Sequence, residues 1–313
     1  MTIRRKVILL PQRPTCSASL WAICLLFALY TAWSALLPGT IAGGIDGLLG
    51  TVLLVAFALV HGSRRYGLTS ILVFFVICLF VSNASENLSI LTGFPFGRYN
   101  YTDVLGPKLF LVPVVIGGAY AGAGYVSWMV AHVLLDYPGP ASRFAGWALP
   151  AIGAVLMVSW DLALDPGAST IGKSWIWIDG GAFFGVPFQN FIGWYLTVFV
   201  FLALFSWYQS GRSIRQGEGR GFWAQAIVMY FLLALRYPLV YARTVESREV
   251  IDPAGHVWRT GDIRATAALV ALFTMMSLWP ARFAMDLVPK NYCTLLSIRK
   301  GQIGATIVPM LRF

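Results

Sequence analysis

Long apolar runs recur along this chain, and each is close to the roughly 20 residues that a helix needs to cross the hydrocarbon core of a bilayer. The runs are continuous rather than alternating, which favours helices over the strands of a membrane barrel. Of the 313 residues, 58% are hydrophobic and only 12% are charged, unlike soluble domains. We therefore expect an all-α fold, a polytopic membrane helix bundle with about eight transmembrane helices. The predicted helices begin near Ser19, Gly44, Leu68, Leu109, Phe144, Phe188, Phe222 and Arg264.

Positive residues orient the predicted bundle. Lysine and arginine cluster before the first helix, after the second, in the sixth connection and in the C-terminal tail, which all fall on one side. Cytoplasmic loops carry such an excess, so we expect a multi-pass protein of the inner (plasma) membrane with both termini cytoplasmic. The connections are too short to bury a core of their own. Residues 1–313 are therefore expected to form a single integral membrane domain, with cytoplasmic tails at 1–17 and 289–313.

The net charge of +10 is explained by the same topology signals and by attraction to anionic lipid headgroups. The basic residues are scattered over several short loops rather than gathered on one segment. The lipid bilayer is therefore an expected partner, and nucleic acid is not.

Ionisable residues stand inside three of the apolar runs: Glu86, Asp161 and Arg236. Such residues are costly in hydrocarbon and usually mark function. All three runs are predicted to point outward, and at 1.5 Å per residue the three charges lie roughly 21 to 27 Å from the cytoplasmic helix ends. Asp165 follows Asp161 by four residues, so both carboxylates share one face if the helix persists. We predict that these four residues meet near the outer surface.

A structural alternative is that Arg236 neutralises one carboxylate, another acid caps a helix end, and the aromatic loops are interfacial belts. For any one residue this alternative is favoured. It is not favoured for the set, because three acids, one arginine and two dense aromatic loops exceed what an ion pair needs. For Arg282 and Asp286 we retain the structural alternative and predict an interfacial salt bridge.

The numbers and positions of histidine, lysine and cysteine argue against several other kinds of site. The chain has three histidines, too few for a membrane di-iron centre, and its lysines fall in tails, loops or helix ends rather than where a retinal Schiff base would form. His61 and His132 could ligate a haem, but isolated interfacial histidines are more common. The four cysteines lack metal or redox spacing and are expected to be packing residues, as are Gly118 and Gly122 with their small-xxx-small spacing. No metal and no cofactor are expected.

Two stretches near the predicted site have a specific resemblance. The first is ENLSILTGFPFGRYNYTDVLGP from Glu86 to Pro107; the second is SWDLALDP from Ser159 to Pro166, followed by WIWIDGGAFFGVPFQNFIGW. Together they resemble the membrane-integral carotenoid biosynthesis family that includes the bisanhydrobacterioruberin and γ-carotene 1,2-hydratases. The resemblance implies a cofactor-independent enzyme of the hydro-lyase type, a carotenoid 1,2-hydratase, that adds water across the terminal C1=C2 bond of an acyclic end group. It also implies a carotenoid substrate such as lycopene, γ-carotene or a bacterioruberin precursor, with other enzymes of carotenoid biosynthesis as candidate partners.

The residues fit that reaction. Protonation of the alkene at C2 gives a tertiary cation at C1, and a carboxyl group in apolar surroundings can stay protonated and act as the acid. We predict Asp161 as the general acid, Glu86 or Asp165 as the group that handles the water, and Arg236 as the partner of whichever carboxylate remains charged. Aromatic faces can stabilise the cation. The predicted substrate-binding residues are Phe94, Phe96, Tyr99, Tyr101, Trp160, Trp175, Trp177, Asp179, Phe183, Phe184 and Asn190.

Two rival functions stay open. Asp161 and Asp165 have the D-x-x-x-D spacing with which a membrane prenyltransferase holds Mg²⁺ and a prenyl diphosphate, although a second aspartate-rich motif is missing from the sequence. The charged residues could also belong to a non-enzymatic protein that binds or transports a carotenoid. Consumption of a prenyl diphosphate, or binding without turnover, would distinguish these alternatives from hydration.

Overall fold

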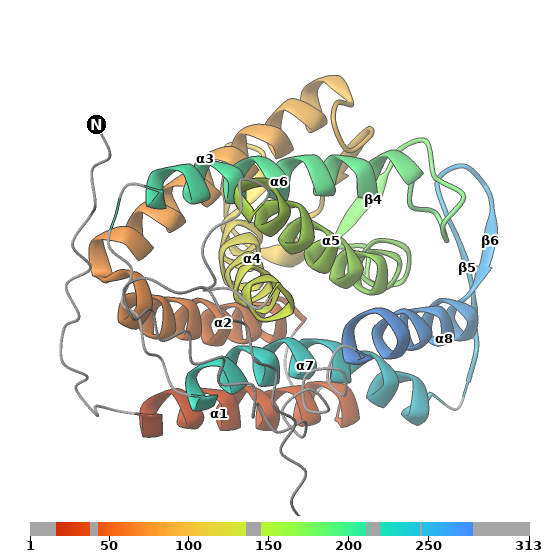
Figure 1. Cartoon of the computed structure of the whole chain (residues 1–313). Coiled ribbons are helices and arrows are strands. Elements are labelled where there is room, and N and C mark those ends of the chain that lie inside the picture. The colour runs from red at the N-terminus through yellow and green to blue at the C-terminus, as the bar shows by residue number, and fades with distance from the viewer. Residues whose placement is uncertain are drawn as a thin grey trace, which may run out of the picture.

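The chain is described here by a computed structural model, which places residues 17–37, 43–135, 145–210, 212, 220–244 and 246–277. Helices dominate these residues, which confirms the all-α prediction (Figure 1). The α-helices are α1 (Ser17–Leu36), α2 (Gly43–Tyr66), α3 (Leu68–Thr92), α4 (Val114–Leu134), α5 (Ala145–Pro166), α6 (Phe188–Gln209), α7 (Arg220–Arg243) and α8 (Thr260–Val270). A π-helical turn extends α5 over Gly167–Ile171, and another extends α8 over Ala271–Met276.

Among the described residues, seven helices, α1 to α7, are long and apolar enough to cross a membrane, as expected of a multi-pass membrane protein. The eighth predicted helix begins at Thr260 rather than near Arg264, and its continuation lies outside the described residues. So do Arg282, Asp286 and both predicted tails, 1–17 and 289–313, apart from Ser17 at the start of α1.

Helix α4 lies inside the bundle, between α3 and α6 on one side and α2 and α7 on the other (Figure 1). Its glycines allow this close approach. A Cβ atom added at Gly118 would lie 2.6 Å from Thr51 Cγ2, and one added at Gly122 would lie 2.7 Å from Leu54 Cβ. The predicted packing role of these two glycines, at the contact between α2 and α4, is confirmed.

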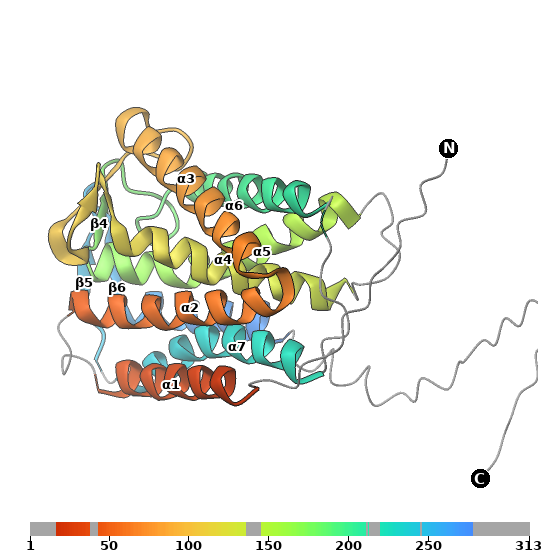
Figure 2. The same ribbon diagram turned by 90° about the vertical axis from the view of Figure 1, so that its left-hand side faces the viewer.

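Short strands form at one end of the bundle, where β4, β5 and β6 are seen in Figure 2. These strands lie in the connections that follow α3, α5 and α7. In the described residues they form three antiparallel pairs: β1 (Tyr99–Tyr101) with β4 (Trp175–Trp177), β2 (Lys108–Leu109) with β3 (Val112–Pro113), and β5 (Glu249–Ile251) with β6 (Val257–Arg259).

The β2–β3 pair explains why α4 begins at Val114 rather than near Leu109, as the apolar run predicted. Pro113 ends the hairpin, and proline suits the entrance of a helix because its missing N–H has no intrahelical partner there. The amide of Val114 donates back to the carbonyl of Pro107 at 2.9 Å.

The opposite end of the bundle contains His61 and His132, which are both buried. His61 Nδ1 lies 2.7 Å from the hydroxyl of Tyr125, and its Nε2 lies 3.0 Å from the carbonyl oxygen of Phe222. His132 Nε2 lies 3.3 Å from the hydroxyl of Tyr66. These contacts make the two histidines part of the helix packing. Cys24 and Cys78 are likewise buried in the core, as predicted, whereas Cys16 and Cys293 lie outside the described residues.

Candidate active site

The β1–β4 pair places four aromatic side chains over the ends of α3 and α5. In the antiparallel register Tyr99 opposes Trp177 and Tyr101 opposes Trp175. Because side chains alternate along a strand, these four residues share one face of the pair. The opposed rings are in contact, with centroids 4.8 Å apart for Tyr99 and Trp177 and 5.9 Å apart for Tyr101 and Trp175. All four carry a polar hydrogen, so this face can donate hydrogen bonds to buried acceptors.

Glu86, near the end of α3, receives hydrogen bonds from three tyrosines. Tyr99 and Tyr101 both donate to Oε2, the latter at 2.9 Å, and Tyr120 of α4 donates to Oε1 at 2.9 Å. The side chain of Glu86 is almost fully buried. Burial, reinforced by the nearby Glu86, raises the pKa of Tyr99 and of Tyr101 well above the usual value. Both phenols therefore stay protonated and act as donors.

Asp161 and Asp165 are brought together on one face of α5, as predicted from their spacing. The amide of Asn190, in the first turn of α6, donates to Asp161 Oδ2 at 3.0 Å and to Asp165 Oδ2 at 2.8 Å. Trp175 and Trp177 donate their indole N–H groups to Asp165 Oδ1 at 2.9 and 3.2 Å. Each of the two aspartates and Asn190 is only 1% exposed.

The two aspartates differ in how completely they are hydrogen-bonded. Both oxygens of Asp165 accept hydrogen bonds, whereas Asp161 Oδ1 is buried and has no hydrogen-bond partner among the described residues. An unpaired buried oxygen is costly and calls for an explanation. Within the same part of the chain, no group of three or more His, Cys, Asp or Glu residues is placed to hold a metal ion.

A row of aromatic rings in contact connects Glu86 to α5. Tyr120 stacks on Trp194 of α6, with centroids 4.3 Å apart and planes 10° from parallel, and Trp194 meets Trp160 edge-on at 6.4 Å. Trp160 directly precedes Asp161 and was predicted from the sequence; Tyr120 and Trp194 were not. A tyrosine hydroxyl inside an apolar run is the signal that could have identified Tyr120, because such a group needs a partner in a membrane.

Arg236 does not pair with any of the three acids, and the prediction that it does is wrong. Its guanidinium donates to Asp46 Oδ2 at 3.2 Å, to Ser34 Oγ at 2.9 Å and to Tyr30 Oη at 3.3 Å. It therefore joins α7 to α1 and α2. Successive residues of a helix point about 100° apart, and it is the next residue, Tyr237, that interacts with Trp160 and Asp161 of α5. Neither Asp46 nor Tyr237 was singled out from the sequence.

The other predicted substrate-binding residues divide into two groups. Phe96 is 1% exposed and packs with Tyr99 and Trp177, and Phe183 packs against the same cluster. Both therefore belong to the aromatic cluster around the β1–β4 pair. Phe94, in contrast, is 60% exposed, and Phe184 packs on Trp258 of β6, so neither is brought to the acids.

Asp179 also lies apart from the acids. It forms an exposed ion pair with Arg98, whose Nε donates to Asp179 Oδ2 at 2.8 Å. This hydrogen bond holds the pKa of Asp179 below its usual value. The pair joins the residue before β1 to the loop after β4, so Asp179 supports the strand pair from outside.

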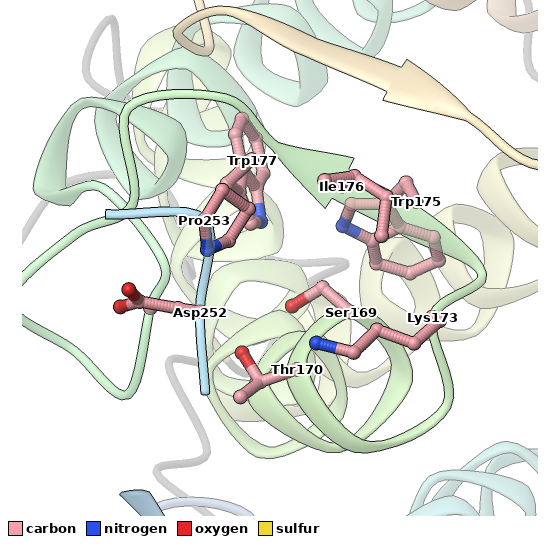
Figure 3. Close-up of a pocket in the computed structure, with 9 residues that line it drawn as sticks. Ser169, Thr170, Lys173, Trp175, Ile176, Trp177, Asp252 and Pro253 are labelled. Atoms are coloured by element: carbon pink, nitrogen blue, oxygen red, sulfur yellow. The ribbon is translucent and has the colours of Figure 1, made fainter. Parts of the chain in front are cut away.

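A small pocket opens on the side of β4 next to the π-helical turn after α5 (Figure 3). The rings of Trp175 and Trp177 form one wall, and Asp252 and Pro253 from the β5–β6 hairpin form another. The remaining lining residues are Ser169, Thr170, Lys173, Ile176 and Gly185.

Comparison with known proteins places these residues in a family. The family described as carotenoid biosynthesis protein matches residues 42–247, which include Glu86, Asp161, Asp165 and the tyrosines and tryptophans that donate to them. Bisanhydrobacterioruberin hydratase from Haloarcula japonica is 34% identical over 147 residues, which is 45% of this chain and 45% of that protein. The alignment thus covers less than half of the relative, and no solved structure matches the chain. The family match spans well over half of the sequence, and the chain therefore belongs to the carotenoid biosynthesis protein family.

Proposed function

We propose that this protein is a carotenoid hydratase that adds water across the terminal C1=C2 bond of an acyclic carotenoid end group without a cofactor. The observation that carries the proposal is the buried pair of Asp161 and Asp165, which share one amide donor while one oxygen of Asp161 stays unpaired. The name of the hydratase relative supports the reaction class.

The asymmetry of the pair supports an assignment of roles to the two aspartates. Two adjacent buried carboxylates are unfavourable as a double anion, because each loses hydration and they repel each other. The pair is therefore expected to hold a proton. Asp165 accepts hydrogen bonds on both oxygens, which favours its charged form. The proton then belongs on Asp161, whose Oδ1 has no other partner in the described part of the chain and can face the substrate.

The reaction balances within the carboxyl cluster. The π electrons of C1=C2 take the proton from Asp161 and form the new C2–H bond, which leaves a tertiary cation at C1. The rings of Trp160, which directly precedes Asp161, and Trp194, which meets Trp160 edge-on, are the candidates to stabilise the cation. A water oxygen then bonds to C1, and its surplus proton passes to Asp165 or Glu86. The cluster regains the proton that it lost, and nothing is oxidised or reduced.

The depth of the site suits a long substrate. The acids lie toward the end of the bundle that carries the strands, whereas Arg64 and Arg65 occupy the last turn of α2 at the opposite end. By the positive-inside rule that opposite end is cytoplasmic, which supports an orientation with both termini cytoplasmic in the inner (plasma) membrane. A carotenoid comparable in length to the roughly 30 Å hydrocarbon core would present its end group at the outer site.

The donors around the aspartates weaken the prenyltransferase alternative. An Mg²⁺ site needs carboxylate oxygens that face the cation, but Asp165 Oδ1 and the Oδ2 atoms of both aspartates already accept hydrogen bonds from N–H groups. Hydration needs only one free carboxyl oxygen, and Asp161 Oδ1 supplies it.

The test is expression in a bacterium that accumulates lycopene, followed by mass analysis of the extracted pigment. We expect a gain of one water per hydrated end, with the new oxygen derived from ¹⁸O-labelled water and not from labelled dioxygen. Lycopene, γ-carotene and a bacterioruberin precursor are then compared as substrates. Unchanged carotenoid in cells that hold the protein in their membranes would contradict the proposal, and consumption of a prenyl diphosphate would favour the alternative.

A further inference from the structure

The pocket in Figure 3 is separated from Asp165 by a single layer of side chains. The rings of Trp175 and Trp177 line the pocket, while their N–H groups donate to Asp165 Oδ1. Ser169 also lines the pocket, and its hydroxyl donates to the backbone carbonyl of Asp165 at 2.8 Å. Three side chains therefore touch both the pocket and Asp165.

One side of the pocket is polar. Figure 3 shows the hydroxyls of Ser169 and Thr170 and the ammonium group of Lys173 converging, while the carboxylate of Asp252 turns away from them. The free space is enough for about one water molecule, and these groups can hydrogen-bond it. The π-helical turn helps to present these side chains, since Gly172 donates to the carbonyl of Gly167 at 2.9 Å and so widens the turn.

The outer wall of the pocket comes from a different part of the chain. Lys173 Nζ donates to the carbonyl of Ile251 in β5 at 3.3 Å, and Thr170 Oγ1 donates to the carbonyl of Phe184 at 2.6 Å. The β5–β6 hairpin and the loop after β4 thus enclose the pocket without filling it. It lies at the strand-bearing end of the bundle.

We propose that this pocket is the inlet through which single water molecules reach the buried carboxyls. The inference rests on the proposed function. Hydration consumes one water per end group, yet Glu86, Asp161 and Asp165 are only 1 to 3% exposed to solvent. A one-molecule inlet beside Asp165 supplies the nucleophile on the side where the accepting carboxylate lies. It also keeps other water away from the cation.

The inlet predicts a change in product when it is filled. If protonation proceeds but water cannot arrive, the C1 cation loses a proton and returns to an alkene. In D₂O this returned carotenoid carries deuterium. The ratio of deuterated, unhydrated carotenoid to hydrated product therefore reports water delivery separately from protonation.

The Ser169→Val variant places extra methyl groups in the pocket. We expect the deuterated-to-hydrated ratio to rise by about tenfold or more, which corresponds to a modest barrier to water capture. The matched control is Ser159→Val, since Ser159 donates in the same way to the carbonyl four residues earlier, at 2.9 Å, but does not line the pocket. The Ser169→Ala variant, which loses the hydroxyl and opens space, should hydrate more than Ser169→Val.

A second experiment tests the inlet without requiring that the Ser169→Val variant folds normally. The Ser169→Cys variant is assembled first and then treated with methyl methanethiosulfonate, a small thiol reagent, and wild-type protein treated in parallel corrects for the native cysteines. We expect labelling at position 169 to raise the ratio and dithiothreitol to restore it. Labelling at this position with no change of product, or a ratio in Ser169→Val equal to that in Ser159→Val, would overturn the inlet. Wild-type protein that yields neither hydrated nor deuterated carotenoid would instead reject the proposed function itself.

Discussion

Tyr99 and Trp177 are direct partners across the β1–β4 pair, but they donate hydrogen bonds to two different acids. Tyr99 donates to Glu86 of α3, and Trp177 donates to Asp165 of α5. One pair of three-residue strands therefore fixes the positions of two helices that approach the site from different sides. The arrangement makes the strand pair part of the site rather than a simple connection.

Replacing Asp161 by asparagine should remove the proposed proton donor while preserving its size. We expect hydration to fall by about 100- to 10,000-fold, the range typical for loss of a general acid, while the carotenoid remains bound. Pigment that co-purifies with the variant is quantified by absorbance, and turnover is followed by mass spectrometry. Asp103→Asn, at an exposed site, is the control. Wild-type turnover in Asp161→Asn would refute the assignment.

Asn190→Leu should separate the two aspartates from their shared donor. Removing this amide leaves buried carboxyl oxygens unpaired, which is expected to destabilise the protein by about 1 to 3 kcal/mol and to lower hydration. Thermal unfolding in detergent measures the first effect. The adjacent Gln189→Leu change removes an exposed amide that donates to the carbonyl of Gly93 and should affect both quantities far less. Equal effects of the two changes would argue against the bridge.

Tyr120→Phe tests the contribution of a hydroxyl that the sequence did not reveal. The stack on Trp194 is retained, but the hydrogen bond to Glu86 is lost. We expect lower hydration and a loss of about 1 to 3 kcal/mol in the free energy of unfolding, because a buried carboxyl loses a donor. Tyr230→Phe is the comparison: its hydroxyl donates to the carbonyl of Leu156, away from the acids. That variant should be destabilised but should hydrate carotenoid at an unchanged rate.

The pair of Arg236 and Asp46 is expected to contribute to stability rather than to chemistry. A double-mutant cycle with Arg236→Met and Asp46→Asn should give a coupling free energy of about 0.5 to 3 kcal/mol. The hydration rate per folded molecule should stay within about twofold in each single variant, well inside the tenfold that 1.36 kcal/mol represents. A loss of turnover without a loss of stability would instead indicate that Arg236 takes part in the reaction.

Acid should loosen the β5–β6 hairpin through Asp252. Burial opposes ionisation of this carboxyl, but hydrogen bonds from Trp258 and from the backbone and ring of His256 outweigh it and hold the pKa of Asp252 below its usual value. The stabilisation is therefore present above the unfolded pKa of about 3.9 and disappears as the pH falls through the lower folded value. Hydrogen exchange of the hairpin amides measures it. The Asp252→Asn variant should lack this pH dependence, and an unaltered profile would contradict the assignment.

The helices could be predicted because each apolar run is long enough to cross the bilayer. The meeting of Asp161 with Asp165 could be predicted as well, since a spacing of four residues fixes a shared helix face. The predicted depth of Glu86 in the membrane placed it at the same level as the aspartates of α5, and the structure has it near them. Depth says nothing about rotation around a helix axis, however, and this is why Arg236 was placed with the wrong partner.

The strand pair could not have been predicted in this way. Its partners, Tyr99 and Trp177, are far apart in the sequence, and three-residue strands leave too little alternation to recognise. The tyrosines and tryptophans were recognised as aromatic residues near the site, but their role as donors depends on that register. Tyr120 was not predicted either, because the glycines of its helix indicate only close packing against neighbouring helices.

The loop closed by β1 and β4 contains all of α4 and α5. The ribosome therefore synthesises β1 long before β4. Strand β1 has no partner strand until α4 and α5 have been synthesised and inserted into the membrane. Only then can the paired strands donate hydrogen bonds to both Glu86 and Asp165. A nascent chain arrested before Trp175 would carry these acids without the strand pair, so the candidate site is completed only after α4 and α5 have been synthesised.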